Sequence, residues 1–167
     1  DRSSAASDVY KRQGVCYLHL LTDMYSHAVL GWVLAPGLQS EYTQQALEQA
    51  ITQAGGGNLC ATIHHSDRGS QYACNAYIGI LTEHHIRISM TESYNPTDNA
   101  VAERMNGILK TEWIYGMALF KDEKHARRQI AEMIEFYNNE RPHMSIGMKK
   151  PMDVYYGEVP GKCLWKK

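Results

Sequence analysis

The sequence predicts an α/β protein with one mixed sheet flanked by helices, and two observations predict this class. Two β-rich runs stand next to each other, at residues 15–23 and 27–35. Helix-like and strand-like segments then alternate along the chain. A hairpin followed by such alternation is typical of a mixed sheet covered by helices. At 167 residues, 44% of them hydrophobic, the chain is long enough for one domain with a full core.

The first elements are a hairpin, a helix and a strand. The runs VCYLHLLTD and HAVLGWVLA are separated by MYS, which predicts a turn between two strands. Ser40 is expected to cap a helix whose apolar residues recur at helical spacing and which ends at Gly55–Gly57. ATIHHSD, residues 61–67, predicts a short strand that ends in polar residues.

The second half of the chain is expected to be mainly helical. Residues 74–85 predict a helix and residues 86–91 a strand. In the turn-rich stretch ESYNPTDN, Asp98 can cap a helix over residues 99–115. The last long helix is expected at about Asp122–Asn139, before Arg141-Pro142. No internal repeat or second domain is apparent, and no apolar run approaches the ~18 residues of a membrane span.

The charges are distributed unevenly although the net charge is only −1. Five basic residues stand against ten acidic ones through Glu103, and twelve against eight from Arg104 onward. An acidic part beside a basic part fits a metal site next to a phosphate-binding surface. A mixed, solvated surface would give the same counts. The four cysteines form no CxxC pair, which predicts free thiols in a reducing compartment.

Asp67 is the first candidate functional residue. It stands just past the end of a predicted strand, in HHSDRGSQY. Acids at the ends of strands in α/β folds project into the crevice where ligands bind. An ordinary surface turn explains the same residues, because Asp and Gly are both frequent in turns.

Glu103 is the second candidate. On its predicted helix, Glu103, Asn106 and Lys110 recur at i, i+3 and i+7, so an acid, an amide and a cation align on one face. The apolar residues of the helix lie on a different face. A solvated face with an incidental charge pair is the alternative explanation.

Several ordered motifs together resemble the DDE transposases of the insertion-sequence type, which are related to retroviral integrases. HSDRGSQY is followed by NPTDNAVAERMNGILKTE, with thirty-five residues between Asp67 and Glu103. YLHLLTDMYSHAVLGW and the C-terminal EFYNNERPHMSIGMKKPMDVY are similar to the same family. The resemblance covers residues 14–157, the expected integrase core, and leaves 158–167 as a tail. It implies a ribonuclease-H-like fold.

The resemblance also implies a chemistry. Family members hold two Mg²⁺ (or Mn²⁺) ions with three carboxylates, and hard cations prefer such oxygen ligands. Paired ions can clamp the attacking and leaving oxygens of a phosphodiester, with water as nucleophile for nicking and a 3′-OH for joining. By resemblance, Asp67 and Glu103 are the catalytic metal ligands. The residues expected to contact DNA are Lys110, Asn106, Arg68 and Asn99.

The first acid of the family has no clear counterpart. Asp8 stands upstream of the aromatic-Leu strand, but SDVYKRQ matches the family motif only loosely. Residues 3–13 also match the translation of a sequencing adapter, whose end, GATGTGTATAAGAGACAG, reads DVYKRQ. Residues 1–13 are therefore interpreted as a library artefact, with the native first strand missing or replaced. Asp8 would be a ligand only if it is native, and Asp23 is expected to be a turn residue.

The functional prediction is a catalytic-core fragment of a bacterial insertion-sequence transposase that nicks and joins DNA, with little activity as written. The resemblance implies transposon ends and target DNA as partners, a homo-multimer, and a cytoplasmic, nucleoid-associated location without a membrane. A nuclease of the same fold, or a non-enzymatic DNA-binding remnant, remains an alternative. Arg141 and His143 of NNERPH are open to a structural role or a DNA contact.

Overall fold

The computed structural model describes residues 2–11, 14–90, 104, 107–108, 111–112 and 120–157. For residues 2–11 only the backbone is described, as a strand. The elements, in chain order, are β1 (Arg2–Lys11), β2 (Gly14–Asp23), β3 (Val29–Ala35), α1 (Ser40–Gln53), β4 (Ile63–Ser66), α2 (Ser70–Ala73), α3 (Asn75–Glu83), β5 (Arg87–Met90), α5 (Glu123–Asn139), the 3-10 turn η3 (Met144–Ile146) and α6 (Pro151–Tyr155).

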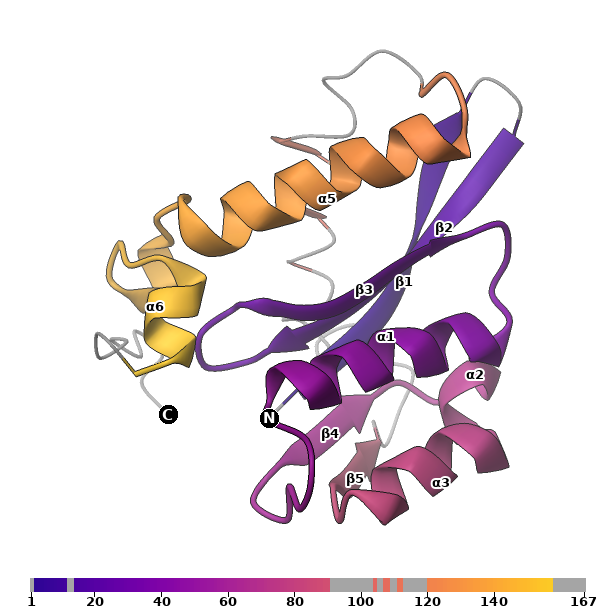
Figure 1. Cartoon of the computed structure of the whole chain (residues 1–167), viewed down its shortest axis with the longest axis vertical. Coiled ribbons are helices and arrows are strands. Elements are labelled where there is room, and N and C mark those ends of the chain that lie inside the picture. Colours follow the sequence, from indigo (N-terminus) through magenta and orange to yellow (C-terminus); the bar gives the residue numbers. More distant parts are fainter. Residues whose placement is uncertain are drawn as a thin grey trace.

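The strands form one mixed sheet in the order β3-β2-β1-β4-β5 (Figure 1). β1, β2 and β3 pair antiparallel through short connections, whereas β4 pairs parallel to β1 and to β5. The parallel pairs need crossovers, which α1 and α3 supply. The predicted mixed sheet is confirmed.

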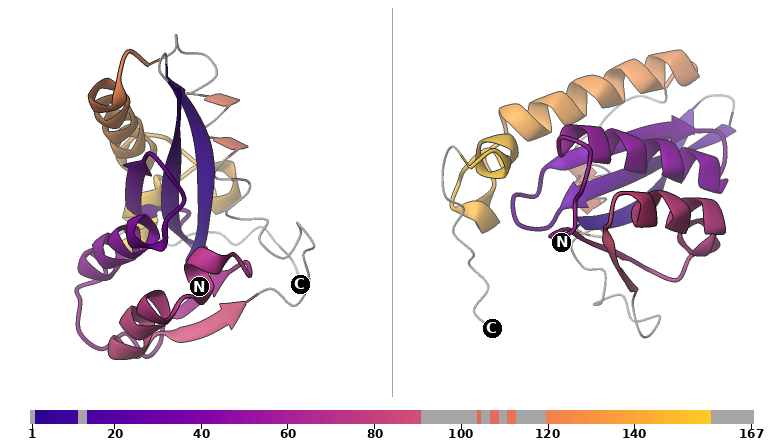
Figure 2. Two further views of the ribbon diagram at one scale, coloured as in Figure 1. Left: turned by 90° about the vertical axis from the view of Figure 1, so that its right-hand side faces the viewer. Right: turned by 60° about the horizontal axis from the view of Figure 1, so that its bottom comes forward.

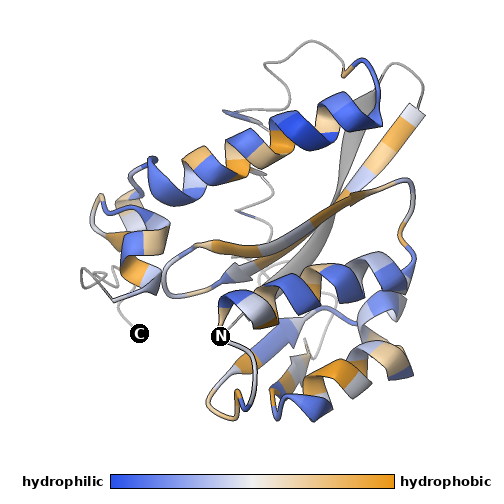
Figure 3. Cartoon of the chain, in the orientation of Figure 1, coloured by the Kyte–Doolittle hydropathy of each residue, from blue (hydrophilic) through white to orange (hydrophobic). Residues whose placement is uncertain are grey.

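Helices cover both faces of the sheet, as Figures 1 and 2 show: α5 lies on one face, and α1 with α3 on the other. Side chains of β2 alternate between them, because successive strand residues point to opposite faces. Leu18 and Leu20 join the buried cluster beneath α5, and Leu21 joins the cluster beneath α1 and α3. We call these clusters the α5-side core and the α1-side core. In Figure 3, α1 and α5 alternate hydrophilic and hydrophobic residues, whereas β3 is mostly hydrophobic.

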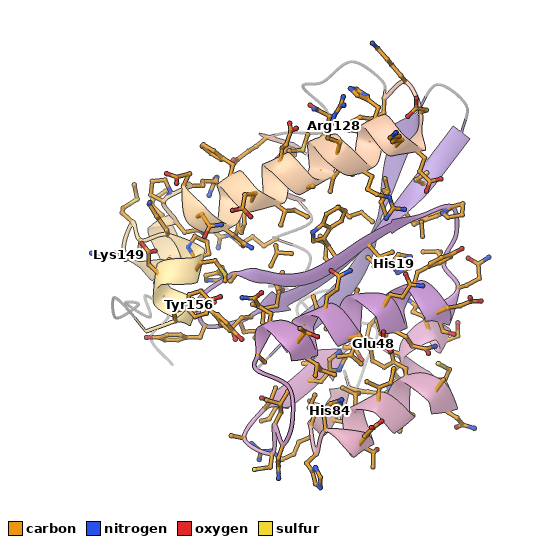
Figure 4. The ribbon with its side chains drawn as sticks, in the orientation of Figure 1. His19, Glu48, His84, Arg128, Lys149 and Tyr156 are labelled. Atoms are coloured by element: carbon orange, nitrogen blue, oxygen red, sulfur yellow. The ribbon has the colours of Figure 1, made fainter. Side chains whose placement is uncertain are left out.

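The contact between α1 and β3 depends on Gly31. A Cβ added there would lie 3.0 Å from the backbone carbon of Ala46 and 3.0 Å from the backbone nitrogen of Ala50, and closer still to the Ala46 oxygen. His19 stabilises the same layer, because its ring bonds to Thr43 on α1 and to the Gly37 carbonyl, at 3.2 and 3.0 Å. Figure 4 shows His19 between β2 and α1.

The C-terminal elements are tied to the sheet by polar contacts. Asp122 caps α5 by accepting a hydrogen bond from the backbone N–H of His125 at 2.7 Å. Near the other end of α5, buried Asn138 bonds to both the N–H and the carbonyl of Val29, at 2.9 and 2.8 Å. Beyond α6, the hydroxyl of Tyr156 accepts a hydrogen bond from Gln53 at the end of α1 (Figure 4).

The expected elements that fall within the described residues agree with the structure apart from several local differences, whereas the helix expected over residues 99–115 lies mostly outside them. Ser40 is the first residue of α1 rather than its cap, since Gln39 occupies the cap position without a side-chain bond. β3 begins at Val29 because His27 adopts a left-handed turn conformation with φ 62°. The short helices α2 and α6 and the turn η3 were not predicted, and helices of four or five residues give too little periodicity to detect. The cap expected at Asp98 lies outside the described residues.

β1 fills the position for which the sequence predicted a missing or replaced strand. Its ten residues pair with β2 along their whole length, from Arg2 opposite Asp23 to Lys11 opposite Gly14. The strand is central, between β2 and β4. No described helix is both long and apolar enough to cross a bilayer.

Candidate active site

Asp67 directly follows β4 and is exposed. Its Oδ1 accepts a hydrogen bond from the backbone N–H of Gly69 at 2.8 Å, which turns the chain into α2. A Cβ on Gly69 would lie 2.9 Å from this oxygen, so the glycine lets the backbone pass close to the carboxylate. Arg68, beside it, is also exposed. The chain thus presents an accessible carboxylate at the carboxyl end of a parallel strand, where ligands of α/β folds bind.

The pairing of β1 with β4 gives a register that can be extended toward Asp67. Arg2 pairs with His64 and Ser3 with His65. Continued by two residues, the same register places Ala5 opposite Asp67. Neighbouring positions of a parallel pair share a face of the sheet, and position 5 pairs with Leu20, which belongs to the α5-side core. The recorded pairing ends at Ser3 and His65; extended by two positions, it leads to positions 5 and 67 on the α5 side of the sheet.

Asp8 occupies a different place. Its position pairs with Tyr17, which in turn pairs with Ala35, a residue of the α1-side core. It is three residues beyond position 5, or about 10 Å along the strand. An odd separation along a strand also changes the face. The register therefore separates position 8 from Asp67 by both distance and face.

The other predicted site residues lie outside the described part of the chain. These residues are Glu103, Asn106, Lys110 and Asn99. Their neighbours on the same segment are described: Ile108 packs against the α5-side core, and the hydroxyl of Thr111 donates to the Gly107 carbonyl at 2.7 Å. Ile108 thus lies on the α5 side of the sheet; we call residues 103–112 the Glu103 segment, of which residues 104, 107–108 and 111–112 are described.

Asp23 is a turn residue, as the sequence predicted. Its Oδ2 accepts hydrogen bonds from the backbone N–H and the hydroxyl of Ser26, at 2.8 and 2.7 Å. These contacts close the turn between β2 and β3. Its carboxylate serves the hairpin rather than the site.

A buried aromatic cluster near the end of α5 was not anticipated from the sequence. The rings of His27 and His143 stack at 5.3 Å, and the Tyr137 hydroxyl lies 2.8 Å from His143 Nε2. The hydroxyl donates to the carbonyl of His27 at 3.1 Å, so His143 Nε2 carries the hydrogen of the other bond. Ser145 can then donate to Nδ1, at 3.4 Å. Both ring nitrogens of His143 are therefore engaged by hydroxyl groups, an arrangement that a neutral ring satisfies.

The electrostatics of this cluster agree with the neutral form. Burial, assisted by the charges of Arg141, His27 and Arg104, lowers the pKa of His143 to about 4, against an opposing effect of Glu112. Burial and the nearby Arg104 also lower the pKa of His27, which Asp23 partly opposes. Burial raises the pKa of Tyr137. The NNERPH motif was the sequence signal for the cluster, and its histidine faces inward.

Arg141 of the same motif contacts Glu112 on the Glu103 segment. Its Nε and Nη2 donate to the two carboxylate oxygens of Glu112, at 3.0 and 2.6 Å. Its guanidinium carbon lies 5.9 Å from the ring centroid of Tyr137. Of the two roles left open by the sequence, the described contacts of Arg141 and His143 are structural.

The donor set at the end of β4 fits a hard divalent cation only in part. Asp67 offers exposed carboxylate oxygen, which Mg²⁺ prefers. The neighbouring register position on β1 holds alanine, which offers no ligand. Among the residues that the structure describes, no group of three His, Cys, Asp or Glu side chains is close enough to hold a metal.

Two family models decide which family the chain represents. Both describe an integrase core domain; they match residues 7–96 and 84–151, and the first covers more than half of the chain. The chain belongs to the integrase core domain family. The predicted resemblance to integrase-type transposases is confirmed at this level.

Relatives of this integrase core include proteins described as transposases. It is 32% identical over 151 residues to a putative transposase for insertion sequence element IS986/IS6110 from Mycobacterium tuberculosis, covering 87% of this chain and 54% of that protein. It is 29% identical over 150 residues to a transposase for insertion sequence element IS629 from Shigella sonnei, covering 88% of this chain and 49% of that protein. The chain thus spans about half the length of these relatives.

The integrase core also shares its fold with solved retroviral integrases. The HTLV-2 integrase catalytic core domain in complex with magnesium superposes with a TM-score of 0.70 at 18% identity, covering 92% of this chain and 94% of that one. The ribonuclease-H-like fold expected from the sequence is confirmed.

Proposed function

We propose that this chain is the catalytic core of an insertion-sequence transposase in which Asp67 and Glu103 are metal ligands and the position of the third acid is held by Ala5. The observation that supports the proposal is the register of β1 against β4, which pairs Arg2 with His64 and Ser3 with His65 and, continued by two positions, leads to Ala5 opposite Asp67. The family membership and the transposase relatives support the reaction class.

In this proposal one group of residues binds the metal ion and another group contacts DNA. Asp67 and Glu103 would hold Mg²⁺ or Mn²⁺, one ion or a pair, through carboxylate oxygens. The bound ions would supply Lewis-acid stabilisation of the attacking and leaving oxygens at a phosphodiester. Lys110 and Arg68 offer cations to DNA phosphates, and Asn106 and Asn99 offer amide donors, which position DNA without reading its sequence.

The chain as written is expected to have little or no nicking or joining activity, because one carboxylate is absent. Three acids hold the ions in the family, and losing one removes both a ligand and a negative charge. A non-enzymatic DNA-binding remnant is therefore the second candidate for this chain, favoured by the same alanine. Binding would then rest on phosphate contacts and weaken steeply as salt rises.

Restoring the acid tests the proposal. Ala5→Asp is expected to strengthen Mn²⁺ binding by about 10-fold or more and to permit Mn²⁺-dependent nicking of supercoiled plasmid. Asp67→Asn in the Ala5→Asp background should abolish both gains. Asp8→Asn is the matched control and should change neither property. Loss of Mn²⁺ binding in Asp8→Asn, with no gain in Ala5→Asp, would instead assign the third ligand to Asp8.

We also propose that residues 1–13 are foreign to the native protein. β1 is a central strand, and strands buried on both faces are normally rich in Val, Ile and Leu, yet this strand reads RSSAASDVYK. Resequencing the source locus across the Gln13–Gly14 junction, with long reads and no adapter ligation, is the test. An acid-containing strand in place of SDVYKRQ is expected; recovery of SDVYKRQ itself would contradict the proposal.

A further inference from the structure

An ion pair between Glu112 and Arg141 links the described part of the Glu103 segment to the C-terminal part of the chain. Glu112 lies nine residues after Glu103. Both of its carboxylate oxygens accept hydrogen bonds from Arg141, at 3.0 and 2.6 Å, across twenty-nine residues of sequence. A two-point arginine–carboxylate contact restricts orientation as well as distance.

Arg141 packs against the buried aromatic cluster of Tyr137, His27 and His143. Its side chain is 22% exposed, and its guanidinium group lies over the fully buried ring of Tyr137. The Tyr137 hydroxyl engages both His27 and His143. His143 is further fixed by backbone bonds with Lys149, at 2.9 Å, and with Met148. The arginine thus extends from a packed cluster whose side chains have little freedom.

This aromatic cluster is connected to the sheet through α5. Asn138, next to Tyr137 on α5, bonds to both backbone groups of Val29 on β3. Tyr137 belongs to the α5-side core, against which Ile108 of the Glu103 segment also packs. The charge of Arg104 reaches the same cluster, since it contributes to the lowered pKa of His27 and His143. The described residues Ile108 and Glu112 therefore contact the α5-side core and Arg141, and the charge of Arg104 acts on the histidines of the same cluster.

We propose that Arg141 is a positioning residue for the metal site: its paired bonds restrain the chain at Glu112, nine residues after Glu103, and the metal affinity of the site depends on that restraint. This inference rests on the proposed function, because it takes Glu103 as a metal ligand. A hydrophobic contact such as Ile108 permits sliding and rotation. The paired bonds to Glu112 remove that freedom.

Metal affinity and local opening test the inference together. Mn²⁺ dissociation constants, measured by electron paramagnetic resonance of the free ion, are expected to rise about three- to tenfold in Arg141→Gln and in Glu112→Gln. The double variant should be no weaker than either single one, because both remove the same contact. In the metal-free protein, amide hydrogen exchange across residues 104–112 should accelerate in the same variants.

Two further variants sharpen the test. Arg127→Gln is the matched control: Arg127 pairs with Glu123 on α5 and donates to the Leu34 carbonyl, so its loss should leave Mn²⁺ affinity and exchange of the segment unchanged. Exchanging the charges, with Glu112→Arg and Arg141→Glu together, should recover part of the lost affinity. A purely structural role of Arg141 in its cluster would not be rescued in this way.

The outcomes separate the two proposals. If Asp67→Asn and Glu103→Gln leave Mn²⁺ binding unchanged, the proposed metal site fails and the positioning role falls with it. If those variants weaken binding while Arg141→Gln and Glu112→Gln match the unmodified chain in affinity and exchange, only the positioning role is overturned. Should Arg141→Gln fail to fold, Glu112→Gln at an exposed site carries the comparison.

Discussion

Replacing His143 by glutamine is expected to make the protein markedly less sensitive to acid. In the native fold the ring is buried and neutral, and its pKa is lowered to about 4 from 6.5. In the unfolded chain the ring would protonate near 6.5. Below that pH the unfolded state binds a proton that the folded state does not, so stability falls as the pH drops from about 6.5 toward about 4.

The size of the effect follows from the difference in pKa. At ~1.4 kcal/mol per pH unit, the full loss of stability is about 3 kcal/mol, most of which is reached at pH 4.5. Because the glutamine side chain of His143→Gln keeps an N–H for the Tyr137 hydroxyl and does not titrate, the variant should be spared this loss. Urea unfolding at pH 7.5 and pH 4.5 gives the loss of unfolding free energy for each protein, and the two losses are then compared.

A matched control excludes a general effect of removing a histidine. His85 is exposed and adopts a left-handed conformation with φ 59°, which asparagine tolerates. His85→Asn should therefore lose stability between the two pH values as the unmodified protein does. An equal loss in His143→Gln and the unmodified protein would refute the assignment of His143 as a buried neutral ring.

Two further predictions concern packing and buried hydrogen bonds. Gly31→Ala should destabilise the fold by about 3 kcal/mol or more in urea unfolding, because the added Cβ would collide with the α1 backbone at Ala46 and Ala50. The control is Gly79→Ala in α3, where an added Cβ meets nothing within 4 Å, and this change should stabilise the fold by about 0.5–1 kcal/mol. An equal response at both glycines would count against the close approach. Asn138→Leu should cost about 2–4 kcal/mol, because it leaves the Val29 N–H and carbonyl buried without this partner. The described side-chain bonds of Asn139 go to Glu135 on the same helix, so Asn139→Leu should change the free energy of unfolding by no more than about 0.5 kcal/mol. A similar cost at both positions would argue against a stabilising role of the two bonds between Asn138 and Val29.

Much of the fold was predictable because it is encoded locally. The alternation of β2, the helical period of α1 and α5 and the turn at Asp23 each depend on residues close in sequence. The position of Asp67 after a strand also follows from local pattern. α2, η3 and α6 were missed because each is too short to show a period. The absence of a first acid stays a prediction from the motifs, and local pattern gave no position for that acid.

The sequence by itself thus determined the class of fold, the family resemblance and Asp67 as the accessible acid of β4. Only the tertiary structure decided that β1 pairs with β4 from Arg2 opposite His64, that Arg141 pairs with Glu112, and that His143 is buried. The physical reason is sequence separation. The register of β1 against β4 joins residues more than sixty positions apart, and Asn138 meets Val29 across 109 residues. Such pairings depend on how complete faces pack together, which no local period of hydrophobicity specifies.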